Sequence, residues 1–483
     1  MPNLSAEPGQ GTTVLYAIEP DTGTPRIFSL DVLRGIALLG ILLISIWDFG
    51  GLSSNEQTRI RLYEKGADHI VLVGLQFLFE GKMRALFALV FGAGMVLYLN
   101  KPNRLTFPAT SELYIRRQLW LMAFGLVNAF VLLWPGDMLF QYGVMGILLF
   151  PFFRMSKKGL LIAAMVCTLI YCGKSFWNYA DDKTAYKKFK AVTLVEARIK
   201  KDSAARHNKD SLSGISKAAL KASDSVAKKT DTLTKEQQKD KSAWEGLAKM
   251  QRYDSTRAMD TAEMKAMRLG YGKVWSHLLQ RSQAKEAMWL YRTGIWDIAS
   301  MMLLGMALLG YGFFNAQFSK SKYILLAVAG ILGGLLLAWY RLHYGTVKML
   351  DYEKYITGNS IPPNQFFAVE RLLLVTGYAS LVMLLLRTVL LQWVWKALAA
   401  AGRMAFSNYL LQSVVCTLFF YGYGFGYFGR LSQLELYFFV AELWLVQLVF
   451  SVLWFRYYNY GPVEWLWRWL TYGKRFPNNK KPL

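Results

Sequence analysis

The chain has 483 residues, of which 54% are hydrophobic and 15% aromatic, and it carries a formal net charge of +24. This apolar composition, interrupted by one long charged segment, is typical of a polytopic membrane protein and not of an ordinary soluble domain. The charge does not indicate nucleic-acid binding, because much of it lies beside apolar runs, where basic residues set topology and contact anionic lipid headgroups.

The first predicted span covers residues 27–50, since a bilayer is crossed by about 20 mostly apolar residues. It follows a polar segment, residues 1–25, which we predict to be a flexible cytoplasmic tail. The span carries Asp31 and Arg34 on one face, with Asp48 near its other end. A lone charge in mid-membrane costs roughly 2.5–3.5 kcal/mol, so the first two either form a structural pair or line a polar site between helices.

A polar connection, residues 51–66, leads to a mixed segment over residues 67–99. We predict an interfacial or re-entrant helix in its first half and a span from Lys82 onward, separated by the charged string Glu80 to Arg84. Eight further spans are expected. They lie at about 114–134, 137–153, 158–176, 295–314, 322–343, 366–386, 404–421 and 434–456. The predicted fold class is therefore all-α, a polytopic helix bundle of about ten transmembrane helices.

Lys and Arg residues in the short loops predict the orientation of the bundle. They follow the second, fourth, sixth and eighth spans and form a basic tail over residues 474–483. This pattern alternates if both termini are cytoplasmic. The spans then divide into an N-terminal membrane region, residues 26–176, and a C-terminal one, residues 295–473.

Between these regions lies a basic insertion, residues 177–294, with 25 Lys and Arg against 14 Asp and Glu, a net charge of +11. It lacks the apolar periodicity of a packed domain, so we predict a largely helical hairpin or a partly disordered segment on the extracytoplasmic side. Near its end W-E-G-L-A-K-M and V-W-S-H-L-L-Q regain amphipathic spacing, which is typical of helices on a membrane surface.

Several polar residues in or beside the spans are candidate site residues. Asp137 is either the N-cap of the fourth span or a catalytic carboxylate. Lys82 and Arg84 either bring cations under the first helix or extend to the headgroups. His69, just before the second span, either faces an outward cavity or is an ordinary interfacial residue. Cysteines lie apart from one another and from histidines, so no metal site or disulfide framework is predicted.

The C-terminal half offers a second polar face. Arg403, Asn408 and Gln412 follow one helical stripe, which indicates hydrogen bonding between helices or a cavity. Glu370 and Arg371 are adjacent in a span, so they point in different directions and need separate partners.

Five blocks of this sequence resemble the YeiB-like family of bacterial inner-membrane proteins, domain-of-unknown-function family 418. The blocks are S-L-D-V-L-R-G-I-A-L-L-G-I-L-L (Ser29 to Leu43), G-K-M-R-A-L-F-A-L-V-F-G-A-G (Gly81 to Gly94), W-P-G-D-M-L-F-Q-Y (Trp134 to Tyr142), G-R-M-A-F-S-N-Y-L-L-Q-S (Gly402 to Ser413) and G-P-V-E-W-L-W-R-W-L-T-Y-G (Gly461 to Gly473). They keep the family order and cover most of the membrane part. The resemblance implies a multi-pass protein of the bacterial inner membrane. The first block is also similar to membrane acyltransferases of the heparan-glucosaminide acetyltransferase type, which pass an acyl group to a sugar.

Two positions depart from the family pattern. Many relatives carry His in a G-L-L-H-A-type string where this chain has Asn128, and they tend to carry Asn where it has Ser45. Acyl transfer to a hydroxyl usually needs a general base, most often His. Asn cannot take a proton at neutral pH, although it can donate hydrogen bonds to an oxyanion. If His is the base in relatives, this chain uses a carboxylate such as Asp137 or has lost the activity.

Three functions follow as hypotheses. The leading one is a membrane acyltransferase without a bound cofactor that moves an acyl group from acyl-CoA to a glycan or other envelope acceptor. Its catalytic candidates are Asp31, Arg34, Asp137 and His69, and its substrate-binding candidates are Lys82, Arg84, Asn128, Arg403, Asn408 and Gln412. The alternatives are a transporter for a small polar or amphipathic solute and a non-catalytic envelope scaffold. No inverted repeat of the transporter kind is visible in the sequence, which favours the enzyme. No pattern indicates an oligomeric state.

Overall fold

The computed structural model describes residues 26–51, 66–100, 107–212, 233–251, 253–346, 352–358, 361–388 and 390–480. These residues form helices and no strand. The N-terminal helices are α1 (Phe28–Gly50), α3 (Ala67–Leu78), α4 (Lys82–Leu99), α5 (Phe107–Phe130), α6 (Leu139–Leu148), η1 (Phe150–Arg154) and α7 (Lys157–Leu212). The insertion continues with α9 (Lys235–Gln251), α10 (Tyr253–Met267), α11 (Tyr271–Gln283) and the π-helix η2 (Ala284–Gly294). The C-terminal helices are α12 (Ile295–Gly310), α13 (Lys320–Arg341), η3 (Leu342–Thr346), α14 (Tyr352–Gly358), η5 (Pro363–Phe366), α15 (Phe367–Leu385), α16 (Gln392–Arg403), α17 (Ala405–Phe420), α18 (Gln433–Tyr457) and α19 (Pro462–Tyr472).

The predicted all-α class is confirmed. Seven helical stretches of the described chain are long and apolar enough to cross a membrane, namely 28–50, 69–99, 157–205, 271–310, 320–344, 363–385 and 433–457. The three other predicted spans correspond to α5 and to the shorter apolar helices α6 and α17. Since length and composition alone leave these three open, the count of ten stays a prediction.

The two ends of α1 lie against different parts of the chain. At its start, the hydroxyl of Ser29 donates to the carbonyl of Phe314, 2.6 Å away. At its end, the amide of Gly429 donates to the carbonyl of Gly50 at 2.8 Å. The basic-residue pattern assigns Phe314 to a cytoplasmic loop and Gly429 to an outer one. These contacts show that the two loops lie at opposite ends of α1, and the cytoplasmic placement of the termini stays a prediction.

A reciprocal pair of glycines lets α1 and α16 pack backbone against backbone. A Cβ on Gly35 would overlap the carbonyl of Leu398, and a Cβ on Gly402 would overlap the carbonyl of Asp31. Small residues allow such close approach between membrane helices, where packing and not hydrophobic burial drives association. Both glycines lie in sequence blocks that carry the family resemblance.

Gly402→Ala is therefore expected to push α16 away from α1 and to lower the free energy of unfolding by about 1–3 kcal/mol. The change in melting temperature of the purified protein measures it. Gly270→Ala is the matched control, because no atom lies within 4 Å of its added Cβ. Equal melting temperatures for both variants would contradict the close approach.

Two helical segments are broken, the first of them where the sequence predicts it. Phe79–Gly81 separates α3 from α4, at the charged string predicted to interrupt this segment. Met404 separates α16 from α17, and the new N-terminus is capped by Glu464, which accepts from the amides of Phe406 (2.8 Å) and Ser407 (3.1 Å). The last two family blocks thus meet at one helix N-terminus, where a carboxylate satisfies unpaired amides.

A buried ion-pair network ties α4, α13 and α15 together. Lys82 Nζ lies 2.7 Å from Glu370 Oε1, with both side chains fully buried. Arg341 Nε donates to the other oxygen of Glu370 at 2.8 Å and also lies 3.5 Å from Glu80. The neighbouring Arg371 pairs instead with Asp297 of α12, at 2.8 Å. The prediction that Glu370 and Arg371 need separate partners is confirmed.

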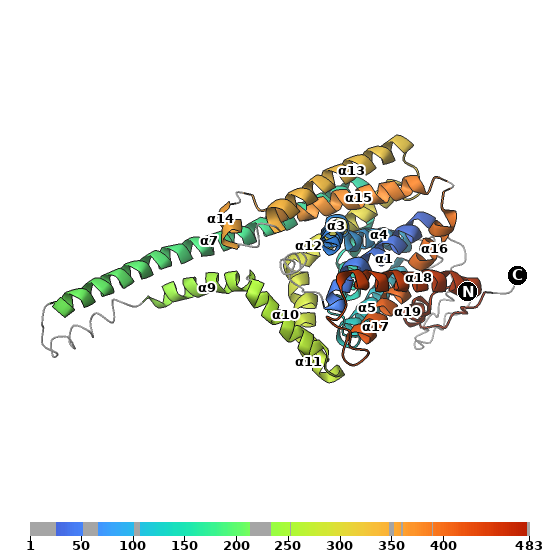
Figure 1. Ribbon diagram of the computed structural model, residues 1–483. Coiled ribbons are helices and arrows are strands. Elements are labelled where there is room, and N and C mark those ends of the chain that lie inside the picture. The colour runs from blue at the N-terminus through green and yellow to red at the C-terminus, as the bar shows by residue number, and fades with distance from the viewer. Residues whose placement is uncertain are drawn as a thin grey trace, which may run out of the picture.

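The insertion is an arm that leaves the bundle and returns to it. Figure 1 shows α7 running on far beyond the bundle, while α9, α10 and α11 lead back. The helix predicted as a span at 158–176 therefore continues without a break into the insertion. An aromatic cluster holds α7, α9 and α14 together: it contains Tyr179, Tyr186, Trp244, Tyr355 and Ile356. The insertion is thus helical where the structure describes it.

Candidate functional site

Asp137 is a fully buried carboxylate in the loop between α5 and α6. Its Oδ2 accepts from the amide of Phe140 at 2.9 Å, the contact expected of a residue that caps α6. Its Oδ1 accepts from the side-chain amide of Asn128 on α5 at 2.7 Å. The capping interpretation and a functional role are therefore compatible, because the cap occupies one oxygen and leaves the other facing neutral donors.

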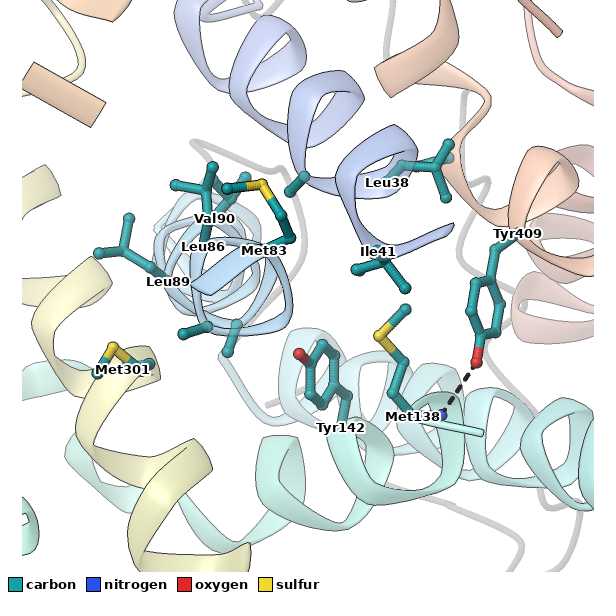
Figure 2. Packing of buried hydrophobic residues seen from close by; sticks show 14 of the residues in the cluster. Leu38, Ile41, Met83, Leu86, Leu89, Val90, Met138, Tyr142, Met301 and Tyr409 are labelled. Carbon is teal, nitrogen blue, oxygen red and sulfur yellow. Dashed lines mark hydrogen bonds between the residues drawn. The ribbon is translucent and has the colours of Figure 1, made fainter. Parts of the chain in front are cut away.

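Tyr409 of α17 completes the setting of this carboxylate. Its hydroxyl donates to Asp137 Oδ1 at 3.4 Å and accepts from the amide of Met138 at 3.2 Å. Figure 2 shows Tyr409 reaching Met138 from one side, with Ile41 of α1 and Tyr142 of α6 nearby. The Tyr142 hydroxyl donates to the carbonyl of Arg84 at 2.8 Å, which links α6 to α4. Groups from three helices, α5, α6 and α17, thus fix the carboxylate in place.

The returning part of the insertion covers this region. Tyr271 donates to the carbonyl of Val131 at 2.8 Å, and Ser282 donates to that of Ala129 at 3.3 Å. Arg281 pairs with Glu263 at 2.7 Å and with Asp48 of α1 at 3.6 Å. These contacts seat α11 over the loop that carries Asp137.

A small crevice of about 10 Å³ lies between the insertion and the loop, which is room for one water-sized group. It is lined by Asp48, Trp134, Pro135, Gly136, Glu263, Met267, Leu278, Arg281, Lys285 and Tyr421. Beside it, Glu286 of η2 is buried among Asp137, Gln141, Lys285 and Arg84. We call the group formed by Arg84, Asn128, Asp137, Gln141, Glu286 and Tyr409 the outer site. Within the described chain no group of three or more side chains is arranged to hold a metal ion.

Burial raises the pKa of Asp137 to about 6, although the hydrogen bonds from Phe140, Asn128 and Tyr409 act in the opposite direction. Burial disfavours the charged form, and no cation forms an ion pair with this carboxylate in the part of the chain that the structure describes. A carboxyl group with a pKa near neutrality can both accept and release a proton at physiological pH, which suits a general base.

A function that uses ionised Asp137 is therefore expected to fall as the pH drops below about 6. The stability contribution has the opposite sign. Because the folded pKa is raised, the contribution of Asp137 to stability is present at low pH and is lost as the pH rises through about 6. Rates and melting temperatures measured from pH 5 to 8, in wild type and Asp137→Asn, check both trends. A rate that is flat across pH 6 would contradict the assignment.

The other predicted site residues are distributed over the bundle. Asp31 and Arg34 form an ion pair, with 3.0 Å between Oδ1 and Nη1, near the start of α1. At 1.5 Å per residue they lie about 20–25 Å along the helix from Asp48, so they belong to the opposite end from the outer site. Arg403 stacks on Phe455 at 3.8 Å at that same end. The structure thus brings Asp137, Asn128 and Arg84 together and leaves Asp31 and Arg34 apart from them.

Three further candidates take part in helix packing. Lys82 belongs to the ion-pair network. Asn408 and Gln412 hydrogen-bond to Ser451 (3.0 Å) and Gln447 (3.0 Å) of α18, as expected of a polar stripe between helices. His69 is half-buried near the start of α3.

Sequence reasoning missed Glu286, Lys285, Gln141 and Tyr409. The first two lie in the insertion, whose overall charge hides them. The available signal was the amphipathic spacing just before them, at V-W-S-H-L-L-Q, together with two adjacent charges in an otherwise apolar turn.

Comparison with known proteins finds a family model for part of the chain and relatives that cover nearly all of it. A family model described as "Protein of unknown function (DUF418)" matches residues 308–474. "Uncharacterized protein YxaH" of Bacillus subtilis (strain 168) is 28% identical over 97% of this chain and 99% of its own length. "Uncharacterized protein YeiB" of Escherichia coli (strain K12) is 29% identical over 92% of this chain and 96% of its own. No solved structure matches.

Apolar helices of spanning length and a polar site between them define an α-helical membrane protein. Within that class, the chain matches the DUF418 family model over residues 308–474 and is similar to YxaH and YeiB over nearly its whole length.

Proposed function

We propose that this protein is a transferase of the bacterial inner membrane that moves an acyl group from a cytoplasmic acyl thioester to an acceptor at the outer face. The observation that carries the proposal is the buried Asp137 carboxylate, positioned by Asn128 and Tyr409 and covered by the insertion. Asp137 takes the proton of an acceptor O–H or N–H as the acceptor atom attacks the thioester carbonyl carbon. The carbon–sulfur bond breaks, and the thiolate leaves.

Asn128 supports this assignment of roles. It occupies the position where relatives carry His in the resemblance described above, and it donates to Asp137 at 2.7 Å. A side-chain amide in that place orients a carboxylate but cannot take its proton. In this chain the carboxylate itself is therefore the base.

The end of the bundle that carries Arg34 and Arg403 is cationic, which suits the binding of an acyl-CoA donor. Arg34 is 28% exposed, and Arg403 lies within electrostatic range of Arg26 and Asp31. Guanidinium groups bind phosphate well, and a CoA thioester carries several phosphates. Basic residues beside the spans also suit anionic lipid headgroups.

The packing of the two halves favours a transferase over a transporter built from inverted repeats. In the described chain α13 packs along α15, whereas α4 and α5, at the equivalent place in the first half, make only slight contact. Related halves would repeat the same contacts.

The test is thermal stabilisation of the purified protein in detergent by acetyl-CoA, longer acyl-CoAs and free CoA. A ligand at a hundred times its dissociation constant stabilises by about 2.7 kcal/mol, so binding raises the melting temperature. We expect a shift with CoA species that Arg34→Ala removes. Absence of any shift in folded wild-type protein would reject the donor and favour the transporter.

A further inference from the structure

Glu286 is the acidic residue that the insertion contributes to the outer site. Its side chain is buried, with 5% of the residue exposed; its carboxylate lies beside the side chain of Gln141, but neither oxygen has a well-formed hydrogen bond among the described residues. It lies in η2, which is a π-helix. This conformation is rare in proteins, and where it occurs it is frequently at a functional site. An unpaired buried carboxylate is destabilising, so a fold that retains one has reason to use it.

Neighbouring side chains leave further acceptors without partners. In the described part of the chain, Asn128 Oδ1 makes no hydrogen bond, and the amide of Gln141 makes no well-formed one, although it lies beside Glu286. The orientation of Asn128 is fixed, because its Nδ2 donates to Asp137. Together with Glu286, these residues present four acceptor oxygens and one donor nitrogen without well-formed hydrogen bonds. The group that would satisfy them is rich in N–H or O–H donors.

The charges around the outer site indicate which donor-rich group would bind there. Asp137 and Glu286 lie within electrostatic range of each other, and neither forms an ion pair in the described ranges, although Arg84 and Lys285 are close. Lys285 lines the crevice beside Asp48 instead. A primary ammonium has three N–H donors and one positive charge, and its head is about as large as a water molecule. It matches both the acceptors and the carboxylates.

We infer that Glu286, with Gln141 and Asn128, forms a binding subsite for a primary ammonium group. If the proposed transferase function holds, on which this step rests, the bound amine is the acceptor. Asp137 then takes one proton from R–NH3+, and the free amine nitrogen attacks the thioester carbonyl carbon. The carbon–sulfur bond breaks, and the second N–H proton passes to the leaving thiolate. The products are an amide, a free thiol and protonated Asp137.

The test is direct binding to the full-length protein in detergent without any acyl donor. Ethanolamine is the probe; ethylene glycol keeps its size without the charge, and choline keeps the charge without N–H donors. We expect a rise in melting temperature with ethanolamine only. Glu286→Gln is expected to weaken ethanolamine binding roughly tenfold or more, since a charge-assisted hydrogen bond is lost.

The variants also separate binding from folding. Glu286→Gln should melt close to the wild-type temperature without ligand, because glutamine keeps the size of the side chain and an acceptor oxygen. Glu112→Gln, at a side chain that is 69% exposed, is the matched control and should bind ethanolamine normally. Gln141→Leu is a second variant, expected to weaken ethanolamine binding in the same direction.

The inference is overturned by equal shifts with ethanolamine and ethylene glycol, by no ethanolamine shift in wild type, or by a Glu286→Gln variant that melts well below wild type. Ethanolamine binding without CoA binding would instead reject only the transferase. CoA binding without ethanolamine binding would reject only the ammonium subsite.

Discussion

Glu370→Gln is expected to lower the free energy of unfolding by about 3–5 kcal/mol, because it leaves Lys82 and Arg341 buried without their shared carboxylate. Lys82 is fully buried and Arg341 nearly so, and water cannot replace the lost charge. The melting temperature in detergent and the yield of monodisperse protein measure the effect.

The matched control is again Glu112→Gln, whose partner Arg116 is exposed, since surface pairs contribute about 0–1 kcal/mol. If Glu370→Gln melts within a degree of the control, the network does not hold α4, α13 and α15 together. A double variant, Lys82→Met with Glu370→Gln, should recover part of the loss, because it removes one of the stranded charges together with its partner.

Asp137→Asn is expected to reduce acyl transfer by about 10²–10⁴-fold, the usual range for loss of a general base. The fold should persist, because the asparagine oxygen can still accept a hydrogen bond from the amide of Phe140 and the variant removes a buried charge. Transfer rates at saturating donor, together with the melting temperature, separate the two effects.

Tyr409→Phe is the companion variant. It removes the 3.4 Å hydrogen bond to Asp137 and the contact with the Met138 amide but keeps the carboxylate, so a smaller loss of rate is expected. A Tyr409→Phe rate below that of Asp137→Asn would move the catalytic role from the carboxylate to the phenol.

The sequence predicted the parts of this fold that depend on local patterns. Apolar runs predicted the long helices, the charged string at Glu80 predicted the break between α3 and α4, and the i, i+4 spacing of Asn408 and Gln412 predicted a shared face. Adjacency alone showed that Glu370 and Arg371 could not share a partner. These properties are carried by a single helix and need no knowledge of its neighbours.

The outer site could not be predicted in the same way, because its members come from α4, α5, α6, α17 and η2. Asp137 was identified from its position after Pro135 and Gly136, but nothing in the sequence brings Glu286 to it. That meeting depends on the insertion folding back, held by contacts such as Arg281 with Asp48. The strongly basic composition of the insertion predicts a solvated segment. That average does not show that α11 and η2, near the end of the insertion, pack against the bundle.

The most direct measurement follows radiolabel from acetyl-CoA in bacterial membrane vesicles that contain the full-length protein and their native envelope molecules. We expect label to pass from the thioester to a stable product with wild type and with Glu112→Gln, and this transfer to fall about a hundredfold or more with Asp137→Asn. Label that stays in the thioester with wild type, or that is transferred equally by Asp137→Asn, would contradict the proposal.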